Sequence, residues 1–439
     1  MRRILWGLTL TGFLTAILLA QEKPVLSPLT KNFVTVDSPV VALAHVMVID
    51  GTGATPSTDQ TITIENGVIR EIGPSASLNV PAGAHILDMT GRSAIPGLVG
   101  MHDHMFYPTA SGQGPVQGAP ALYGEMGFSF PRLYLAGGVT TIRTAGSIEP
   151  YTDLALKKMI DNGKMPGPKM HITRAELGAA IKAAHARGIK VTGHLCSVGF
   201  SEAAELGIDD LEHGLVVDQE FNPKKEPDVC PPDPDEHPIL EKLDVESKPV
   251  QEVIRKLVQQ HVAVTSTLVI FETFVANRPP LQDRVMQAMS LPSRADYLAV
   301  RTKIAEGNGS GAMLLKKEMQ FEHDFVHAGG LLISGEDPTG YGGVLAGFGD
   351  QRQTELLVEA GFTPLEAIHI ATQNGAEFLG ESDRIGTLKP GKQADIVVVK
   401  GDPGQRIADL ENVELVFKDG IGYDPQKLIR SVQAAVGLH

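Results

Sequence analysis

Between residues 94 and 375, short apolar runs alternate with amphipathic segments, and this alternation constrains the fold more than any other feature. Runs typical of buried strands occupy residues 94–101, 138–143, 170–172, 190–195, 209–213, 263–270 and 330–334. Helical periodicity is found at residues 152–161, 175–187, 250–261, 312–328, 351–360 and 364–375. Strands that alternate with helices favour βα units, and therefore an α/β fold built on a parallel sheet or barrel.

Both ends of the chain are richer in short strands than the middle. Strand-like patterns occupy residues 40–49, 60–64, 68–72 and 85–88, and they return at residues 396–400 and 413–418. Asn66-Gly67 lies between two of these runs and is a strong signal for a β-hairpin. The simplest interpretation is that segments 38–92 and 384–422 pair into one small β domain. That domain would flank an α/β domain over residues 93–383.

The first twenty residues have the pattern of a secretory signal peptide. Arg2 and Arg3 precede an apolar run of about 17 residues that ends at Ala20 and is followed by polar residues. The alternative is a single membrane anchor, for which this run is at the short limit. We therefore expect residues 1–20 to be removed and the mature chain to be secreted or periplasmic, with no membrane contact after cleavage.

The composition narrows the classes of partner. The 439 residues include 38 basic and 52 acidic side chains, so the formal net charge is −14. An acidic balance argues against nucleic-acid binding, which needs clustered Lys and Arg. Cys196 and Cys230 are the two cysteines and allow at most one disulfide, whose formation the sequence leaves open. The expected partner is a small molecule, and a homo-oligomer is left open.

Candidate metal ligands follow several of the predicted strands. His102 and His104 come directly after the strand at residues 94–101, and positions two apart on a strand project to the same face. An isolated pair of this kind is equally typical of two loop histidines. However, His194, His213 and Asp337 also stand at the ends of predicted strands, and such ends form the active face of parallel α/β folds. Four histidines and one aspartate there predict a site for zinc or a similar metal.

The sequence resembles the amidohydrolase superfamily, in the branch of imidazolonepropionase-like and Xaa-Pro-dipeptidase-like enzymes. The motifs that carry the resemblance are IPGLVGMHDH (95–104), GGVTTIRTAGS (137–147), GHL (193–195), LEHG (211–214), SGEDPTG (334–340) and RIGTLKPGKQADIVVV (384–399). The resemblance implies a (β/α)8 TIM-barrel-like domain beside a composite β-sandwich made from both termini. It also implies that one or two metals bind to His102, His104, His194, His213 and Asp337.

One βα unit of the family's barrel is missing from the pattern. Between Arg143 and His194 the sequence offers one strand, near residues 169–172, where the family has two. In the family the missing unit carries a carboxylated lysine that bridges two metals. Lys169 could replace it, although a surface lysine between prolines is the more ordinary interpretation of MPGPKMH. We therefore expect one zinc ion, with two as the alternative.

Together these features predict an exported hydrolase of C–N bonds in amides or cyclic amides. Zinc held by His102, His104, His194 and Asp337 would lower the pKa of water towards neutral pH. Asp337 would accept the proton of that water and pass it to the leaving nitrogen. His213 would bind a second metal or polarise the substrate carbonyl. The alternatives are a periplasmic dipeptidase that cleaves Xaa-Pro or Xaa-basic bonds, and a non-catalytic remnant that binds metal or ligand.

Overall fold

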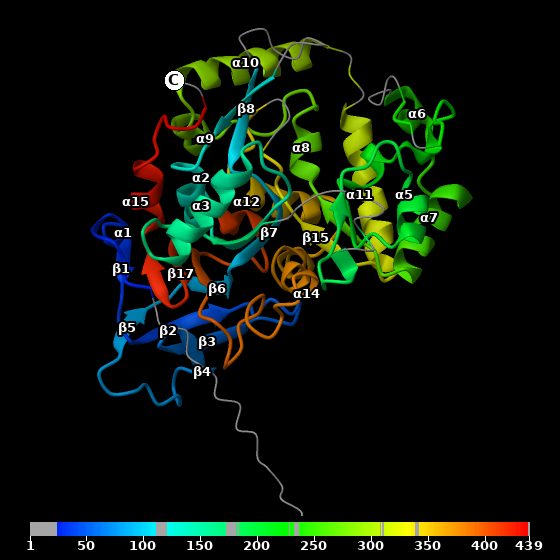
Figure 1. Ribbon diagram of the computed structural model, residues 1–439. Coiled ribbons are helices and arrows are strands. Elements are labelled where there is room, and N and C mark those ends of the chain that lie inside the picture. The colour runs from blue at the N-terminus through cyan, green and yellow to red at the C-terminus, as the bar shows by residue number, and fades with distance from the viewer. Residues whose placement is uncertain are drawn as a thin grey trace, which may run out of the picture.

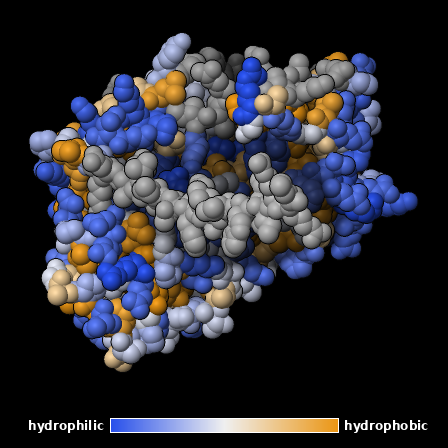
Figure 2. Space-filling view, turned by 60° about the horizontal axis from the view of Figure 1, so that its bottom comes forward, coloured by the Kyte–Doolittle hydropathy of each residue, from blue (hydrophilic) through white to orange (hydrophobic). Residues whose placement is uncertain are grey.

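The computed structural model describes residues 24–110, 121–172, 181, 184–227, 229–231, 237–307, 309, 311–338 and 342–437. The predicted signal peptide at residues 1–20 lies outside the described residues, as does most of the predicted helix at residues 175–187. Within the described part of the chain, none of the helices combines the length and the apolar character needed to cross a membrane. The face shown in Figure 2 is mostly hydrophilic, with hydrophobic residues in small scattered patches.

The strands at the two ends of the chain form one nine-stranded sheet, at the lower left of Figure 1. Their order is β1-β18-β17-β16-β6-β2-β3-β4, and β5 pairs with β2. These strands are β1 (Val34–Val36), β2 (Val40–Val48), β3 (Ser57–Glu65), β4 (Val68–Pro74), β5 (His85–Asp88), β6 (Arg92–Pro96), β16 (Ile396–Lys400), β17 (Val413–Lys418) and β18 (Ile421–Tyr423). The two ends meet where β6 runs antiparallel to β16, with Ala94 opposite Val398.

This pairing agrees with the prediction that the ends of the chain share one sheet. Asn66 and Gly67, which join β3 to β4, have φ values of 52° and 86°. A two-residue hairpin turn of this hand needs positive φ at both positions, which Asn and Gly tolerate best. The composite β-sandwich and the domain boundaries at 38–92, 93–383 and 384–422 stay predictions.

The middle of the chain contains two parallel sheets. One has the order β11-β10-β7 and the other the order β12-β13-β14-β15. Their strands are β7 (Leu98–Asp103), β10 (Val139–Thr144), β11 (Lys169–Ile172), β12 (Thr192–Gly193), β13 (Asp210–Glu212), β14 (Ala263–Ser266) and β15 (Leu332–Ser334). The sheets adjoin where the N–H of Asp337 donates to the carbonyl of His102 at 2.8 Å.

That one βα unit is missing stays a prediction, because residues 173–180, which lie between β11 and β12, are outside the described part of the chain. Seven parallel strands occur in the order expected of the barrel, and none of the described strands pairs with the outer edge of β11 or β12. The gap lies between these two strands, where the sequence lacks a unit. The structure therefore describes an arrangement of barrel type, and closure into an eight-stranded barrel is not among its features.

One predicted strand, residues 94–101, is divided between two sheets. Its first part belongs to β6 of the nine-stranded sheet and its second part to β7. Pro96 cannot donate a ladder hydrogen bond. A Cβ at Gly97 would lie 2.0 Å from Oγ1 of Thr140, so the chain passes β10 closely at a position that only glycine allows.

Helices cover the outer faces of the parallel sheets. Phe200, Leu257, Phe321 and Leu356, from α5, α7, α11 and α12, join Val264 of β14 in one buried cluster. The α-helices are α1 (Pro28–Lys31), α2 (Phe130–Ala136), α3 (Pro150–Asp161), α5 (Phe200–Leu206), α6 (His237–Lys242), α7 (Lys248–Gln259), α8 (Leu268–Glu272), α9 (Asp283–Ala288), α10 (Leu291–Glu306), α11 (Gly311–His327), α12 (Phe348–Glu359), α13 (Pro364–His369), α14 (Gly375–Phe378) and α15 (Pro425–Arg430). A hairpin of β8 (Phe106–Ala110) and β9 (Ala121–Glu125) follows β7.

Candidate metal centre

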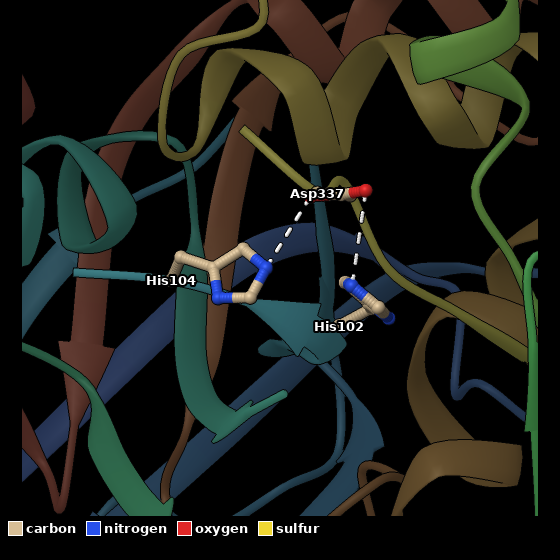
Figure 3. A group of neighbouring side chains, drawn as sticks. All are labelled: His102, His104 and Asp337. Atoms are coloured by element: carbon tan, nitrogen blue, oxygen red, sulfur yellow. Dashed lines mark ion pairs between the residues drawn. The ribbon is translucent and has the colours of Figure 1, made fainter. Parts of the chain in front are cut away.

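His102 of β7, His104 directly after β7 and Asp337 after β15 meet at the carboxyl ends of the two strands (Figure 3). Nε2 of His104 lies 3.3 Å from Oδ1 of Asp337, and Nε2 of His102 lies 3.8 Å from Oδ2 of the same carboxylate. All three side chains are buried. The alternation of β7 therefore places both imidazoles on one face, as the spacing of the motif predicts.

Hydrogen bonds fix which ring nitrogen of each histidine faces the aspartate. Nδ1 of His102 lies 2.7 Å from a carboxylate oxygen of Glu212, and Nδ1 of His104 lies 3.2 Å from the carbonyl of Gly146. Both partners only accept, so the two Nδ1 atoms donate, and in the neutral rings the Nε2 lone pairs face Asp337. Lone pairs and a carboxylate at this range repel each other unless a proton or a cation lies between them. Such an arrangement is typical of metal-binding histidines held by an outer hydrogen bond.

His213 approaches the same carboxylate from β13. Its Nε2 lies 3.8 Å from Oδ2 of Asp337, and its Nδ1 lies 2.8 Å from Oγ1 of Thr267. The His213 ring centroid is 4.4 Å from that of His102 and 4.6 Å from that of His194, which is exposed at the edge of the group. The structure therefore brings together all five residues that the sequence predicts as ligands.

Two of these residues have strained backbones. The φ of His213 is 71° and the φ of Asp337 is 47°, in the left-handed region that residues other than glycine rarely adopt. Each such residue costs on the order of 1 kcal/mol or more, and strain of this kind is concentrated at functional sites. Both lie where a strand ends, so the strain re-aims a side chain at the mouth of the sheets.

Sequence reasoning missed Glu212, whose carboxylate accepts a hydrogen bond from Nδ1 of His102 at 2.7 Å. Adjacent residues of a regular strand point to opposite faces, so regular alternation along β13 would turn Glu212 away from His213. The left-handed turn at His213 ends the alternation and lets both side chains reach the interior. Arg143 donates to Glu212 at 2.9 Å and pairs with Asp210 at 3.1 Å. Arg143 is therefore part of the support beneath the histidines.

The charges of the group shift its pKa values in opposite directions. Burial alone would raise the pKa of Asp337, but His102, His104 and His213 outweigh it and hold that pKa well below its usual range. Burial, reinforced by His102, lowers the pKa of His213 to about 3. His213 is therefore a neutral imidazole at neutral pH, which is the form that binds metals.

Comparison with known proteins agrees with this geometry. The amidohydrolase family model matches residues 326–421, a segment that contains β15, Asp337 and the C-terminal strands of the nine-stranded sheet. Over this segment the chain is similar to the amidohydrolase family. A dihydroorotase from Pelobacter propionicus is 35% identical over 92 residues, which are 21% of this chain and 19% of that protein. The match thus spans about a fifth of the curated relative.

Solved amidohydrolase-like structures extend the likeness to nearly the whole chain. A Xaa-Pro dipeptidase with bound methionine in its active site is 18% identical, with a TM-score of 0.63 over 88% of this chain and 100% of that one. A molinate hydrolase is 18% identical, with a TM-score of 0.54 over 92% and 99%. At these identities the likeness shows the fold alone.

Lys169 does not occupy the position of the superfamily's bridging lysine. It begins β11, at the end of the strand opposite the metal centre, and its ammonium pairs with Asp395 and, at 3.1 Å, with Asp419. The idea that Lys169 replaces the missing ligand is therefore wrong. A lysine at the start of a parallel strand points towards the amino-terminal face of the sheet, here covered by the segments around β16 and β17.

The donor set of this centre fits zinc. Imidazole nitrogens and a carboxylate oxygen are the ligands that zinc accepts outside cysteine sites. Each Nδ1 already has a partner, so the three Nε2 atoms and the Asp337 carboxylate remain as donors on one side of the cluster. The buried Arg143 pairs with Asp210 and Glu212, and the ion pairs of the Asp337 carboxylate are with histidines.

Proposed function

We propose that this chain is an exported, zinc-dependent hydrolase that cleaves C–N bonds of amides or cyclic amides. The observation that carries the proposal is the convergence of the Nε2 atoms of His102, His104 and His213 on the carboxylate of Asp337. Three buried imidazoles around one carboxylate at the carboxyl ends of parallel strands are typical of catalytic metal sites.

His102, His104 and Asp337 are the proposed zinc ligands. The fourth ligand is either His194, which is exposed at the edge of the group, or His213, whose Nε2 also faces the Asp337 carboxylate. Bound zinc lowers the pKa of water to near 7 and polarises a carbonyl oxygen. The chain itself holds the imidazoles in place through Glu212, the Gly146 carbonyl and, for His213, Thr267. We propose one zinc per chain, because Lys169 lies at the wrong end of its strand to bridge a second metal.

Asp337 is the proposed proton carrier. Its pKa lies well below the usual range, so the group is an ionised carboxylate at neutral pH. We propose that this carboxylate accepts the proton of a water molecule whose own pKa the bound zinc would lower. The same carboxyl group can then deliver the proton to the leaving nitrogen, which must be protonated to depart as an amine. If His194 completes the ligand set, His213, neutral and hydrogen-bonded through Nδ1, would orient the substrate carbonyl.

Export is supported by the cysteines. Cys196, two residues after His194, forms a disulfide with Cys230 of the proline-rich segment, and the described residues include no free cysteine. Disulfides persist in oxidising compartments such as the periplasm or the extracellular space. The bridge therefore agrees with the signal-peptide pattern of residues 1–20.

A metal-loaded activity screen tests the proposal. Zinc-saturated protein is assayed against cyclic amides, N-acyl amino acids and Xaa-Pro and Xaa-basic dipeptides, beside a His102→Ala/His104→Ala variant. Hydrolysis of an amide that the variant does not cleave is the expected result. Turnover of dipeptides alone would favour the dipeptidase alternative. Zinc binding with no turnover of any substrate would favour the non-catalytic remnant.

A further inference from the structure

A second group of acidic side chains lies behind the metal centre. Ligand oxygens of Asp103, Glu336 and Asp350 all lie within 4.8 Å of one another. Asp103 and Glu336 are fully buried and Asp350 is 5% exposed. Asp103 separates His102 from His104 on β7, so it faces the opposite side of the strand. This group, the carboxylate cluster, is a different set of residues from the proposed zinc ligands.

Several oxygens of the carboxylate cluster have no partner. Both oxygens of Asp103 and one oxygen of Glu336 are buried and make no hydrogen bond. Asp350 accepts from the N–H of Gly347 at 3.1 Å, and Glu336 accepts from the N–H of Asp350 at 3.0 Å. No cationic side chain of the described residues forms an ion pair with any of the three. A buried carboxylate without a partner is costly, so these oxygens indicate a missing positive group.

Two glycines provide the space in which carboxylate oxygens of the cluster lie. A Cβ at Gly100 would lie 2.1 Å from an Asp103 oxygen, and a Cβ at Gly349 would lie 2.3 Å from a Glu336 oxygen. Any side chain at either position would displace a carboxylate from the cluster. Glycine at these two positions therefore leaves space for the Asp103 and Glu336 oxygens where a side chain would otherwise stand.

We propose that Asp103, Glu336 and Asp350 bind one divalent cation of the oxygen-preferring class, Mg²⁺, Ca²⁺ or Mn²⁺. All the available donors are oxygens, which such hard cations prefer, whereas zinc favours the imidazoles on the other side of β7. Oxygens within 4.8 Å of one another can surround one ion at metal–oxygen distances of about 2.1–2.5 Å.

The cation would tie three elements together next to the zinc site. Asp103 belongs to β7, Glu336 follows β15, and Asp350 lies in the first turn of α12. Asp103 and Glu336 each adjoin a proposed zinc ligand in sequence. Within the described residues, β7 and β15 belong to different sheets, so an ion at this junction would fix the two sheets relative to each other.

Manganese titration of zinc-saturated protein tests the proposal. The protein is first dialysed against a chelating resin and reloaded with one zinc per chain, and free Mn²⁺ is followed by electron paramagnetic resonance. We expect one tightly held Mn²⁺ per chain, a rise in melting temperature on its addition, and displacement by whichever of Mg²⁺ and Ca²⁺ the site prefers. The double variant Asp103→Asn/Glu336→Gln should lose both the bound Mn²⁺ and the rise.

A buried carboxylate elsewhere supplies the matched control. Glu322 of α11 is fully buried and also has an unpartnered oxygen, so Glu322→Gln should bind Mn²⁺ as the unaltered protein does. Equal Mn²⁺ binding by the double variant would overturn the proposal. So would unaltered protein that holds no tight Mn²⁺ and melts at the same temperature with and without it, a result that needs no variant to fold. Neither readout depends on amide hydrolysis, so this inference fails or stands apart from the proposed activity.

Discussion

The proposed zinc site and the carboxylate cluster are built from alternate residues of the same two segments, yet they offer opposite chemistry. His102, His104 and Asp337 present two nitrogens and a carboxylate towards the mouth of the sheets. Asp103 and Glu336, their sequence neighbours, present only oxygens to a sealed interior. The alternation of a strand thus separates donor types by a few ångströms. One short strand can therefore offer ligands to two metals that differ in their preference for nitrogen or oxygen.

The largest expected effect is the loss of zinc from His102→Ala/His104→Ala. Removal of two imidazoles leaves too few donors for tight binding, so zinc content measured by elemental analysis should fall to near zero. His323→Ala/His327→Ala is the matched control, because these two rings stack on the surface of α11 with centroids 4.0 Å apart. That pair should keep its zinc. Full zinc in the His102/His104 variant would show that the two sites are not sorted as described.

Asp337→Asn should separate metal binding from proton transfer. The amide keeps one coordinating oxygen but is no longer a base, so zinc should be largely retained. The rate of hydrolysis should fall on the order of 10²–10⁴-fold. Zinc content and kcat/KM are measured on the same preparation. Unchanged kcat/KM would mean that another group accepts the proton.

Lys169→Ala tests Asp395, a buried carboxylate that, unlike those of the carboxylate cluster, is paired with a cationic side chain. Asp395 is nearly buried and pairs with Lys169 at the amino-terminal end of β11, far from either site. Loss of the ammonium should lower the free energy of unfolding by about 3 kcal/mol, while zinc content stays unchanged. Chemical denaturation and elemental analysis measure the two. Loss of a metal from this variant would contradict this prediction and indicate that Lys169 is a metal ligand.

The smallest expected effect is that of Gly100→Ala. The new methyl group would force Asp103 out of the carboxylate cluster, which should cost about 1–3 kcal/mol of stability and weaken Mn²⁺ binding. Gly309→Ala is the control, because a Cβ at Gly309 would have no atom within 4 Å. Its stability should change by no more than about 0.5 kcal/mol. Similar losses in both variants would argue against a special role for Gly100.

The sequence points to the proposed metal ligands because each of them follows an apolar strand, and the ends of such strands can be recognised from the hydrophobic pattern. It could not predict the carboxylate cluster, since Asp103, Glu336 and Asp350 come together only when β7, β15 and α12 are neighbours in space. Glu212 was missed for a local reason, the left-handed turn at His213 that ends the alternation of β13. The hairpin at Asn66-Gly67 could be predicted because its turn depends on those two residues alone.

The division of residues 94–101 between two sheets is another feature that could not be predicted from the sequence. The apolar pattern continues without a break, and the separation depends on the close approach of Gly97 to Thr140 of another strand. Contacts between distant segments of this kind leave no periodic signal. Lys169 is a related case, because the carboxylates that hold it come from residues 395 and 419.

The antiparallel contact of β6 with β16 has a consequence for the order of folding. Ala94 pairs with Val398, so nearly all of the two parallel sheets is synthesised between the partners. Closure of so long a segment is entropically costly and slow. Until it happens, β6 has an unsatisfied edge that can pair with other chains. We therefore expect the nine-stranded sheet to be completed late in folding, although its first strands are the first to be synthesised.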